Sequence, residues 1–323
     1  MTKGQPSPLT HIRALRSPQD LLPVADVIEQ CFASTLDEDG RDFIRQLRKA
    51  GRIALSEERL PFEREQDLYP LQGFVWLDED QIVGNLSLIP FIFHDRTYQL
   101  IANVAVLPQF RNQGIGRALT EHAIDQVRKS GNNEIWLQVR DDNPVAQHLY
   151  QTLGFREHYR RDTWLLDARQ VAPIAKSSNI IITTRRSSDW KNQQKWLQNN
   201  YPQDITWNFH LEESRFEPGF WKGLQNLIKV NVLHHWAARK NDRLLGLATW
   251  EATRHFADVL WLSVDPEVQE IAIDALLQYF RSEFFSIRPV QINYPANEAR
   301  QVFLNNSFKL QHTLIWMKFT SES

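Results

Sequence analysis

The stretch Val104-Ala-Val-Leu-Pro-Gln-Phe-Arg-Asn-Gln-Gly-Ile-Gly-Arg-Ala-Leu119 decides the fold. It overlaps an apolar, partly β-branched run at 100–107, which predicts a buried strand that ends at Pro108. The segment 109–113 is polar and predicts a loop, and from Gly114 onward apolar residues recur at helical spacing. The stretch therefore predicts a strand, a loop that leads into glycines, and a helix, in that order.

A helix that begins at glycines is a favourable place to bind phosphate. The first backbone N–H groups of a helix have no partner within it, and the helix dipole adds positive potential there. Gly114 and Gly116 lack Cβ, so an anion can approach the backbone closely, and Arg111 and Arg117 add positive charge. A surface turn with two glycines explains the same pattern equally well, so the loop alone leaves both interpretations open.

A second stretch, Asn143-Pro-Val-Ala-Gln-His-Leu-Tyr-Gln-Thr-Leu-Gly-Phe155, favours the phosphate-binding interpretation. Asn143 is a good N-cap, Pro144 a good first helical residue and Gly154 a natural helix end. The run 134–139 before it predicts a strand, and Tyr150 lies on the predicted helix. The predicted order is thus strand, anion loop, helix, strand, and a short helix that carries a tyrosine.

Over residues 100–155 the chain resembles the GNAT superfamily of acyl-CoA-dependent N-acyltransferases. Residues 111–116 look like that family's pyrophosphate loop, and Asn143 and Tyr150 fall where the family has its pantetheine-contacting asparagine and its tyrosine facing the CoA sulfur. The resemblance implies an α+β fold in which a mixed, mostly antiparallel sheet is flanked by helices. It also implies acetyl-CoA as cosubstrate and direct attack of an amine on the thioester, without a covalent enzyme intermediate.

The resemblance assigns roles to individual residues. Tyr150 is the expected general acid, because a phenol with a pKa of about 10 can protonate the departing thiolate. A strand N–H near Ala105 is expected to polarise the thioester carbonyl. Cofactor contacts are expected at Val104, Ala105, Val106, Arg111, Asn112, Gln113, Gly114, Ile115, Gly116, Arg117 and Asn143. A core tyrosine on an amphipathic helix is the alternative explanation of Tyr150.

The general base stays open. The strand segment 98–107 contains no acidic residue. Asp37, Glu38, Asp39 and His94 are candidates by location only, and each is also explained as a solvated turn residue. A water relay is an equally good candidate.

Composition limits the other classes of function. The length of 323 residues suggests two domains, and a net charge of −2 gives no electrostatic case for bulk binding to nucleic acid or to an anionic membrane. Cys31 is the only cysteine and the ten histidines show no ligand spacing, so no disulfide and no metal site are predicted. Residues 1–17 lack the apolar stretch of a secretory signal, and no apolar run is long enough to cross a bilayer. We therefore expect a soluble cytoplasmic protein.

The other elements of the first half follow from patterning. Helices are expected over 18–32 and 42–50, with an acidic turn at 37–40 between them. A hairpin of strands is expected over 74–93, and closing strands at 155–158 and 163–166.

The second half repeats the first. A strand at 179–184, a helix at 189–199 and a hairpin at 236–246 follow in the same order, and 295–308 matches 142–155 without a gap. The interval from the central strand to the next strand, however, shrinks from 31 residues to 26, and keeping the helical period intact places this gap on 109–113.

The repeat has thus lost the residues that bind a cofactor in the resemblance. Glu267 and Gln269 replace the loop glycines, and a carboxylate there would repel phosphate. Phe303 and Ala296 stand where the first half has its tyrosine and asparagine. We expect a catalytic GNAT domain with the acyl-CoA site at 1–167, a linker at 168–178 and a degenerate GNAT-like domain without the pyrophosphate loop at 179–323.

The degenerate repeat has two possible roles: a built-in dimer partner, or a wall of the acceptor pocket. Five aromatic residues fall in the segment equivalent to the acceptor cover of the first half: Trp207, Phe209, Phe216, Phe220 and Trp221. The chain is expected to be a monomer with pseudo-dimeric repeats or a homodimer. The predicted function is N-acetyl transfer to a primary amine of a small molecule or protein. The alternatives are a non-catalytic acyl-CoA-binding regulatory protein and an interaction scaffold without cofactor.

Overall fold

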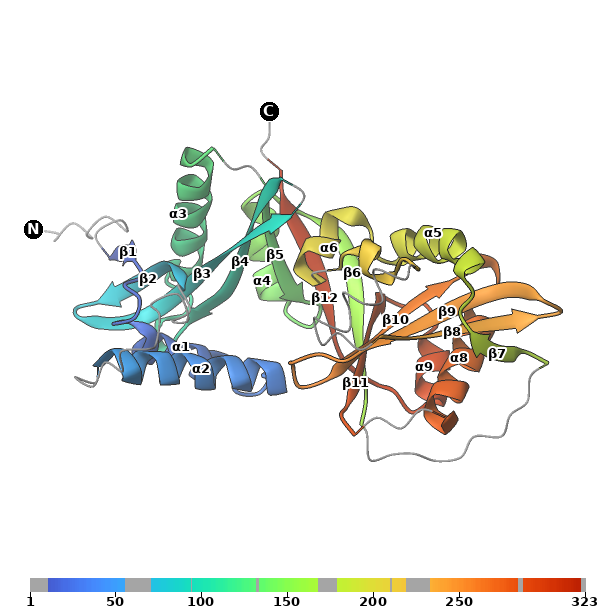
Figure 1. The fold of residues 1–323 in the computed structure, drawn as a ribbon. Helices are drawn as coiled ribbons and strands as arrows, with labels where there is room; N and C mark the ends of the chain where they lie inside the picture. Colours follow the sequence, from blue (N-terminus) through green and yellow to red (C-terminus); the bar gives the residue numbers. More distant parts are fainter. Residues whose placement is uncertain are drawn as a thin grey trace, which may run out of the picture. The chain divides into compact units, whose positions relative to one another are not determined.

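The computed structural model describes residues 11–55, 71–93, 95–131, 134–167, 179–209, 211–218, 233–283 and 287–320 (Figure 1). These residues form an α+β fold whose strands pair mostly antiparallel, with helices on both faces, which confirms the predicted fold class. The chain divides into two compact units. Unit 1 comprises Met1–Val139, Asn143–His158 and Trp316–Ser323, and unit 2 comprises Arg140–Asp142 and Tyr159–Ile315. The predicted linker 168–178 lies outside the described residues.

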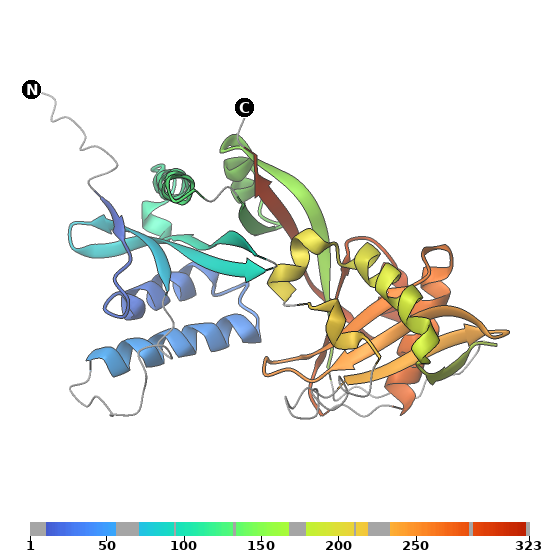
Figure 2. The ribbon, with the colours of Figure 1, turned by 45° about the horizontal axis from the view of Figure 1, so that its top comes forward.

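Unit 1 holds the elements of the first half. In chain order they are β1 (Ile12–Ala14), α1 (Leu21–Phe32), α2 (Glu38–Leu55), β2 (Gln72–Asp78), β3 (Gln81–Phe93), β4 (Arg96–Val106), η3 (Pro108–Phe110), α3 (Ile115–Lys129), β5 (Ile135–Arg140), α4 (Pro144–Thr152) and the start of β6 (Phe155–Leu166). The strand order runs β1-β2-β3-β4-β5, followed by the end of β12 and the start of β6. Within this unit α1 and α2 cover one face of the sheet and α3 the other (Figures 1 and 2).

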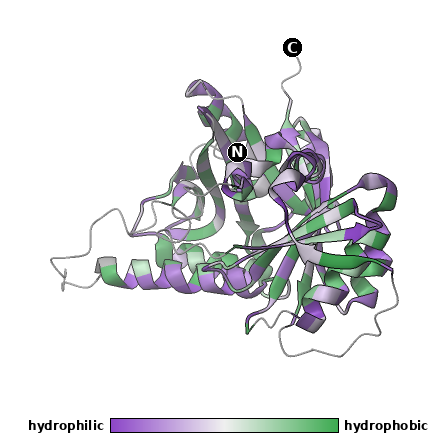
Figure 3. Ribbon diagram, turned by 45° about the vertical axis from the view of Figure 1, so that its right-hand side comes forward, coloured by the Kyte–Doolittle hydropathy of each residue, from purple (hydrophilic) through white to green (hydrophobic). Residues whose placement is uncertain are grey.

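Unit 2 repeats this arrangement. Its elements are β7 (Ile181–Thr184), η4 (Ser187–Asp189), α5 (Trp190–Asn200), α6 (Gln203–Phe209), η5 (Glu213–Phe216), β8 (Leu233–Lys240), β9 (Arg243–Glu251), β10 (Asp258–Val264), η6 (Pro266–Val268), α8 (Gln269–Glu283), β11 (Val290–Pro295), α9 (Arg300–Asn305) and β12 (Lys309–Phe319). In both units one pair of neighbouring strands is parallel, β4 with β5 and β10 with β11. Apolar and polar residues alternate along the helices and strands, as amphipathic elements require (Figure 3).

The units exchange strand segments. β6 passes from unit 1 into unit 2 after His158, and β12 passes into unit 1 at Trp316. In unit 2 the later part of β6 lies antiparallel to β11, with Trp164 opposite Ile292 in the core. The division into 1–167 and 179–323 stays a prediction, and the compact units divide the chain inside β6 and β12 instead.

Two local expectations were wrong. Residues 38–40, expected in a turn, form the first turn of α2, because the Asp37 carboxylate accepts a hydrogen bond from the Gly40 N–H at 2.8 Å and acidic residues favour a helix start. The two closing strands expected at 155–158 and 163–166 are one continuous strand, β6. The charged residues between them, Arg161 and Asp162, are 2% exposed and hydrogen-bond to Asn293 and Thr313 within unit 2.

Each unit places a glycine of its second hairpin strand beneath its long helix. A Cβ on Gly84 would lie 3.1 Å from Ile115 Cγ2 and 3.3 Å from Leu119 Cδ1 of α3. A Cβ on Gly246 would lie 2.7 Å from Val264 Cγ1 and 3.3 Å from the Ala272 Cβ of α8. These glycines let the helix approach the sheet.

None of the described helices is long and apolar enough to cross a lipid bilayer.

Gly246→Val is expected to lower the free energy of unfolding by about 1–3 kcal/mol, because the added methyl groups overpack the core of unit 2. The measurement is urea-induced unfolding followed by tryptophan fluorescence. An unfolding midpoint equal to that of the unmodified protein would contradict this account of the packing.

Candidate functional site

The sheet of unit 1 opens between β4 and β5. These parallel strands pair only from Gln99 opposite Ile135 to Ile101 opposite Leu137. β4 nevertheless continues to Val106, so its last residues form no pairs with β5 in the described part of the chain. A free strand edge of this kind presents backbone N–H and C=O groups to an extended ligand.

A β-bulge marks the start of this open edge. Asn85 of β3 lies opposite Ala105 and Ser87 lies opposite Ala102, so β4 has one extra residue between these pairs. Asn103 has φ 51°, a left-handed conformation that asparagine tolerates better than most residues.

The bulge determines which backbone groups face the open edge. The Leu107 N–H donates to the Val83 carbonyl of β3. Because successive N–H groups of a strand point to opposite sides, that of Ala105 also points toward β3, and those of Val104 and Val106 point toward the open edge. The register therefore favours Val104 or Val106 over Ala105 as the donor to a ligand.

The glycine loop begins α3 without a side-chain cap. Gly114 is the N-cap residue with φ 78°, and within the described part of the chain no side-chain cap bonds the first N–H groups of α3. The left-handed φ explains the glycine at 114. Ile115 is 3% exposed and packs into the core, so only its backbone is available to a ligand.

Among the residues that the structure describes, nothing requires a glycine at position 116. Its φ is not in the left-handed region, and a Cβ there would lie 3.7 Å from Leu149 and 3.9 Å from Val106, which are ordinary van der Waals distances. Close approach of a ligand to the helix start does explain the missing side chain, because a Cβ would stand between the ligand and the N–H groups.

The polar side chains of the loop are exposed and only partly engaged. The Arg111 Nε donates to the Val106 carbonyl at 3.1 Å, and Arg117 donates to the Thr152 hydroxyl at 2.6 Å. Asn112 has φ 62°, and the Gln113 amide lies 3.5 Å from the Gln109 carbonyl. The contact of Arg117 with Thr152 places α4 against the start of α3.

Asn143 and Tyr150 are brought to the same region by α4. The Asn143 side chain accepts a hydrogen bond from the Ala146 N–H at 3.1 Å, as predicted for an N-cap. Tyr150 is 7% exposed, and its ring packs edge-on against Phe155. Burial raises the pKa of the Tyr150 phenol, so the hydroxyl stays protonated at neutral pH. Among the described residues none hydrogen-bonds this hydroxyl, so it is available to a ligand.

The candidates for a general base are weakened. The Asp37 carboxylate is engaged at the start of α2. The Arg41 guanidinium, 2.6 Å from Glu38, holds the pKa of that carboxyl below its usual value, which makes it a poorer base. His94 lies outside the described residues. Asp39 lies in the first turn of α2, so Asp39 and a water relay remain as candidates.

Unit 2 fills its own strand opening with side chains. β10 and β11 pair only at Asp258–Val259 and then diverge. The Asn200 amide donates to the Leu262 carbonyl of β10 at 3.0 Å, and the Tyr201 hydroxyl donates to the Asn293 carbonyl of β11 at 3.0 Å. Side chains thus occupy backbone carbonyls on both strands of the unit 2 opening, a feature that the sequence pattern did not reveal.

The aromatic residues expected to wall an acceptor pocket belong to the core of unit 2. Trp207 and Phe216 are each 1% exposed, and Phe209 packs against Tyr201. Phe220 and Trp221 lie outside the described residues. Core packing explains the described members of this group, and a role of the second repeat as a wall of the acceptor pocket stays a prediction.

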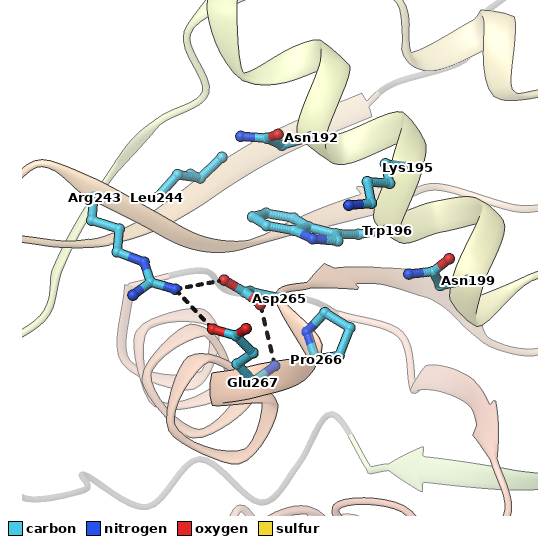
Figure 4. A pocket seen from close by; sticks show the side chains of 9 residues that line it. All are labelled: Asn192, Lys195, Trp196, Asn199, Arg243, Leu244, Asp265, Pro266 and Glu267. Carbon is cyan, nitrogen blue, oxygen red and sulfur yellow. Dashed lines mark hydrogen bonds and ion pairs between the residues drawn. The ribbon is translucent and has the colours of Figure 1, made fainter.

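A pocket of about 640 Å³ lies where unit 2 has lost the glycine loop (Figure 4). Its lining residues come from α5, β9 and η6: Asn192, Lys195, Trp196, Asn199, Arg243, Leu244, Asp265, Pro266 and Glu267. The Arg243 guanidinium lies 3.0 Å from Asp265 and 3.5 Å from Glu267. These two carboxylates make the place unfavourable for a phosphate. Among the described residues no group of three acidic, histidine or cysteine side chains is placed to hold a metal ion.

Part of the sequence matches known proteins. The profile of the acetyltransferase (GNAT) family matches residues 41–155. The chain is 51% identical over 55 residues to a [ribosomal protein bS18]-alanine N-acetyltransferase of Escherichia coli K12, which is 17% of this chain and 37% of that protein. It is 32% identical over 93 residues to N-alpha-acetyltransferase 30 of Schizosaccharomyces pombe, which is 28% of this chain and 62% of that protein.

Solved structures match over nearly the whole chain. A GCN5-related N-acetyltransferase from Sphaerobacter thermophilus aligns with a TM-score of 0.55 at 15% identity and covers 95% of both chains. A tandem GNAT protein from the clavulanic acid biosynthesis pathway aligns with a TM-score of 0.50 at 14% identity and covers 95% of this chain and 98% of that one. At these identities the two structures show a shared fold alone.

Proposed function

Since the chain belongs to the GNAT family through residues 41–155, we propose that it transfers an acetyl group from acetyl-CoA to a primary amine. The observation that carries the proposal is the uncapped start of α3 at Gly114 in the same unit as the open edge of β4. A helix start binds the diphosphate of CoA, and a free strand edge binds its amide-rich pantetheine arm. Residues 111–117 would hold the diphosphate, and Val104, Val106 and Asn143 the arm.

The reaction needs little from the protein beyond orientation and proton transfer. The amine nitrogen attacks the thioester carbonyl, so a C–N bond forms and the C–S bond breaks. A β4 N–H at the open edge donates to the carbonyl oxygen as it gains negative charge. Tyr150 donates its proton to the departing thiolate, which suits a buried phenol that is neutral at physiological pH. The amine proton leaves through water.

The chemical class of the amine acceptor is proposed from the names of the relatives. The Escherichia coli relative is named for the alanine of a ribosomal protein, and the fission yeast relative for an N-alpha amine. Another relative, which is 42% identical over 55 residues, is the streptothricin acetyltransferase of Streptomyces lavendulae. The chain spans less than two thirds of the length of each, so these matches leave the acceptor open between protein N-termini and small-molecule amines. A cytoplasmic location and the oligomeric state likewise stay predictions.

Release of free CoA thiol from acetyl-CoA across a panel of peptide N-termini and small amines tests the proposal. We expect amine-dependent thiol release well above that of acetyl-CoA alone. Calorimetric binding of acetyl-CoA without turnover on any amine would instead favour the alternative, a non-catalytic acyl-CoA-binding regulatory protein. Absence of both binding and turnover would favour a scaffold without cofactor.

A further inference from the structure

The bulge in β4 is held by a buried polar side chain from the neighbouring strand. Asn85 is 0% exposed, and its Nδ2 donates to the Asn103 carbonyl at 3.0 Å. Both Asn85 and Asn103 also contact the hydroxyl of Ser87, at 3.3 and 3.4 Å. The Asn85 Oδ1 is buried without a hydrogen-bond partner. A buried amide with one unpaired atom weakens a core, so its presence here calls for a reason other than stability.

The contact with Asn103 fixes the direction of the next N–H group. A peptide unit is planar and trans, so its C=O and N–H point in opposite directions. The carbonyl of Asn103 and the N–H of Val104 belong to the same peptide unit. When Asn85 holds the carbonyl, the Val104 N–H faces away from Asn85, which agrees with the direction toward the open edge that the alternation from Leu107 gives.

The second repeat offers an internal comparison. Gly84 and Gly246 occupy equivalent places, opposite Val106 and Val264. The residue after the glycine is Asn85 in unit 1 but Leu247 in unit 2. In unit 2 the pairing of β9 with β10 runs from Val259 to Val264 without a shift of register, so the bulge is lacking in that described ladder. The amide and the bulge occur together in the repeat that keeps the glycine loop, and both are missing in the repeat that has lost it.

We infer that Asn85 is a positioning residue for acyl transfer, which holds the peptide between Asn103 and Val104 so that the Val104 N–H receives the thioester oxygen. This inference rests on the proposed function and adds to it a residue that acts through the peptide it holds. Without the Asn85 donor, the peptide is free to rotate, and the oxygen of the tetrahedral intermediate loses a preorganised partner.

Two substitutions test the inference. Asn85→Leu introduces the residue type that unit 2 has at the equivalent position, Leu247, and Asn85→Ala removes the amide. We expect kcat to fall by about a hundredfold in both, the effect of removing one oxyanion donor. CoA has no acyl carbonyl for the Val104 N–H to bind. Its Kd should therefore stay within about threefold of that of the unmodified protein. Val127→Ala is the matched control, because it removes buried methyl groups from the last turns of α3 in the same unit, and Val127 belongs to none of the strands around the bulge. Its kcat should remain unchanged.

A second readout does not depend on turnover or on the stability of a variant. In ¹⁵N-labelled unmodified protein, the Val104 amide should shift more with acetyl-CoA than with CoA, since only acetyl-CoA carries the carbonyl oxygen. Equal shifts, or a kcat of folded Asn85→Leu close to that of the unmodified protein, would overturn the inference. A lack of amine turnover in the unmodified protein would contradict the proposed function instead. The acyl-dependent shift of the Val104 amide would then be compared between the unmodified protein and Asn85→Leu, and an equal shift in both would overturn the role of Asn85.

Discussion

Replacing both loop glycines by glutamate, in the double variant Gly114→Glu and Gly116→Glu, is expected to weaken CoA binding by about a hundredfold or more. Like charges forced together at an interface cost several kcal/mol, and each 1.4 kcal/mol is about tenfold in Kd. The start of α3 has no side-chain cap, so its N–H groups are the expected diphosphate ligands, and two carboxylates there would repel the ligand. Isothermal titration calorimetry with CoA measures the effect.

Gly131→Glu is the matched control for this double variant. Gly131 has φ 82°, close to the φ 78° of Gly114, and a Cβ at either position meets no atom within 4 Å. Glutamate at position 114 and glutamate at position 131 therefore strain the backbone similarly. Gly131, however, follows the C-terminal end of α3, away from the helix start. The control should lose about 1 kcal/mol of stability and keep its affinity for CoA. Undiminished CoA binding by the double variant would rule out residues 111–117 as the diphosphate site.

Tyr150→Phe is expected to lower kcat by about a hundredfold or more while leaving the Kd for acetyl-CoA nearly unchanged, because general acid catalysis contributes about 10²–10⁴ to a rate. The variant deletes one hydroxyl that no described residue hydrogen-bonds, so the free energy of unfolding should change little. Steady-state kinetics with a competent amine, together with binding measured separately, distinguishes the two effects. The pH profile of kcat adds a check. Burial raises the pKa of Tyr150, so any loss of rate from its ionisation should begin above the ordinary phenol pKa of about 10.

Tyr294→Phe is the companion substitution in unit 2. Tyr294 is 0% exposed; its hydroxyl donates to the Gln269 side chain at 3.3 Å and accepts from the Asn200 side chain at 3.4 Å. Loss of these contacts should lower the free energy of unfolding by about 1 kcal/mol and leave kcat unaltered. If Tyr150→Phe and the unmodified protein have equal kcat, Tyr150 is a core tyrosine and leaves the mechanism.

Local signals in the sequence were sufficient for the loop and its two helices. Gly114 appears at the start of α3 and Asn143 caps α4, because cap residues act through their immediate neighbours. The same local logic failed at 37–40, where acidic residues were interpreted as a turn although Asp37 caps a helix. Whether an acidic run is a turn or a helix start depends on one hydrogen bond that composition does not show.

Long-range features were not predictable. One extra residue in the apolar run 100–107 leaves its pattern almost unchanged, so the bulge at Asn103 becomes visible only when β3 lies beside it. The filling of the unit 2 opening by Asn200 and Tyr201 depends on contacts with Leu262 and Asn293, far away in the chain. The loss of the glycine loop in the repeat, by contrast, was visible as a gap, since deletions change spacing.

The passage of β6 and β12 between the units bears on how the chain can be divided experimentally. A fragment that ended after β6 would leave residues 161–166 without their pairing partners in β11. Proteolysis or truncation between the repeats would leave each fragment with an exposed strand edge that invites aggregation.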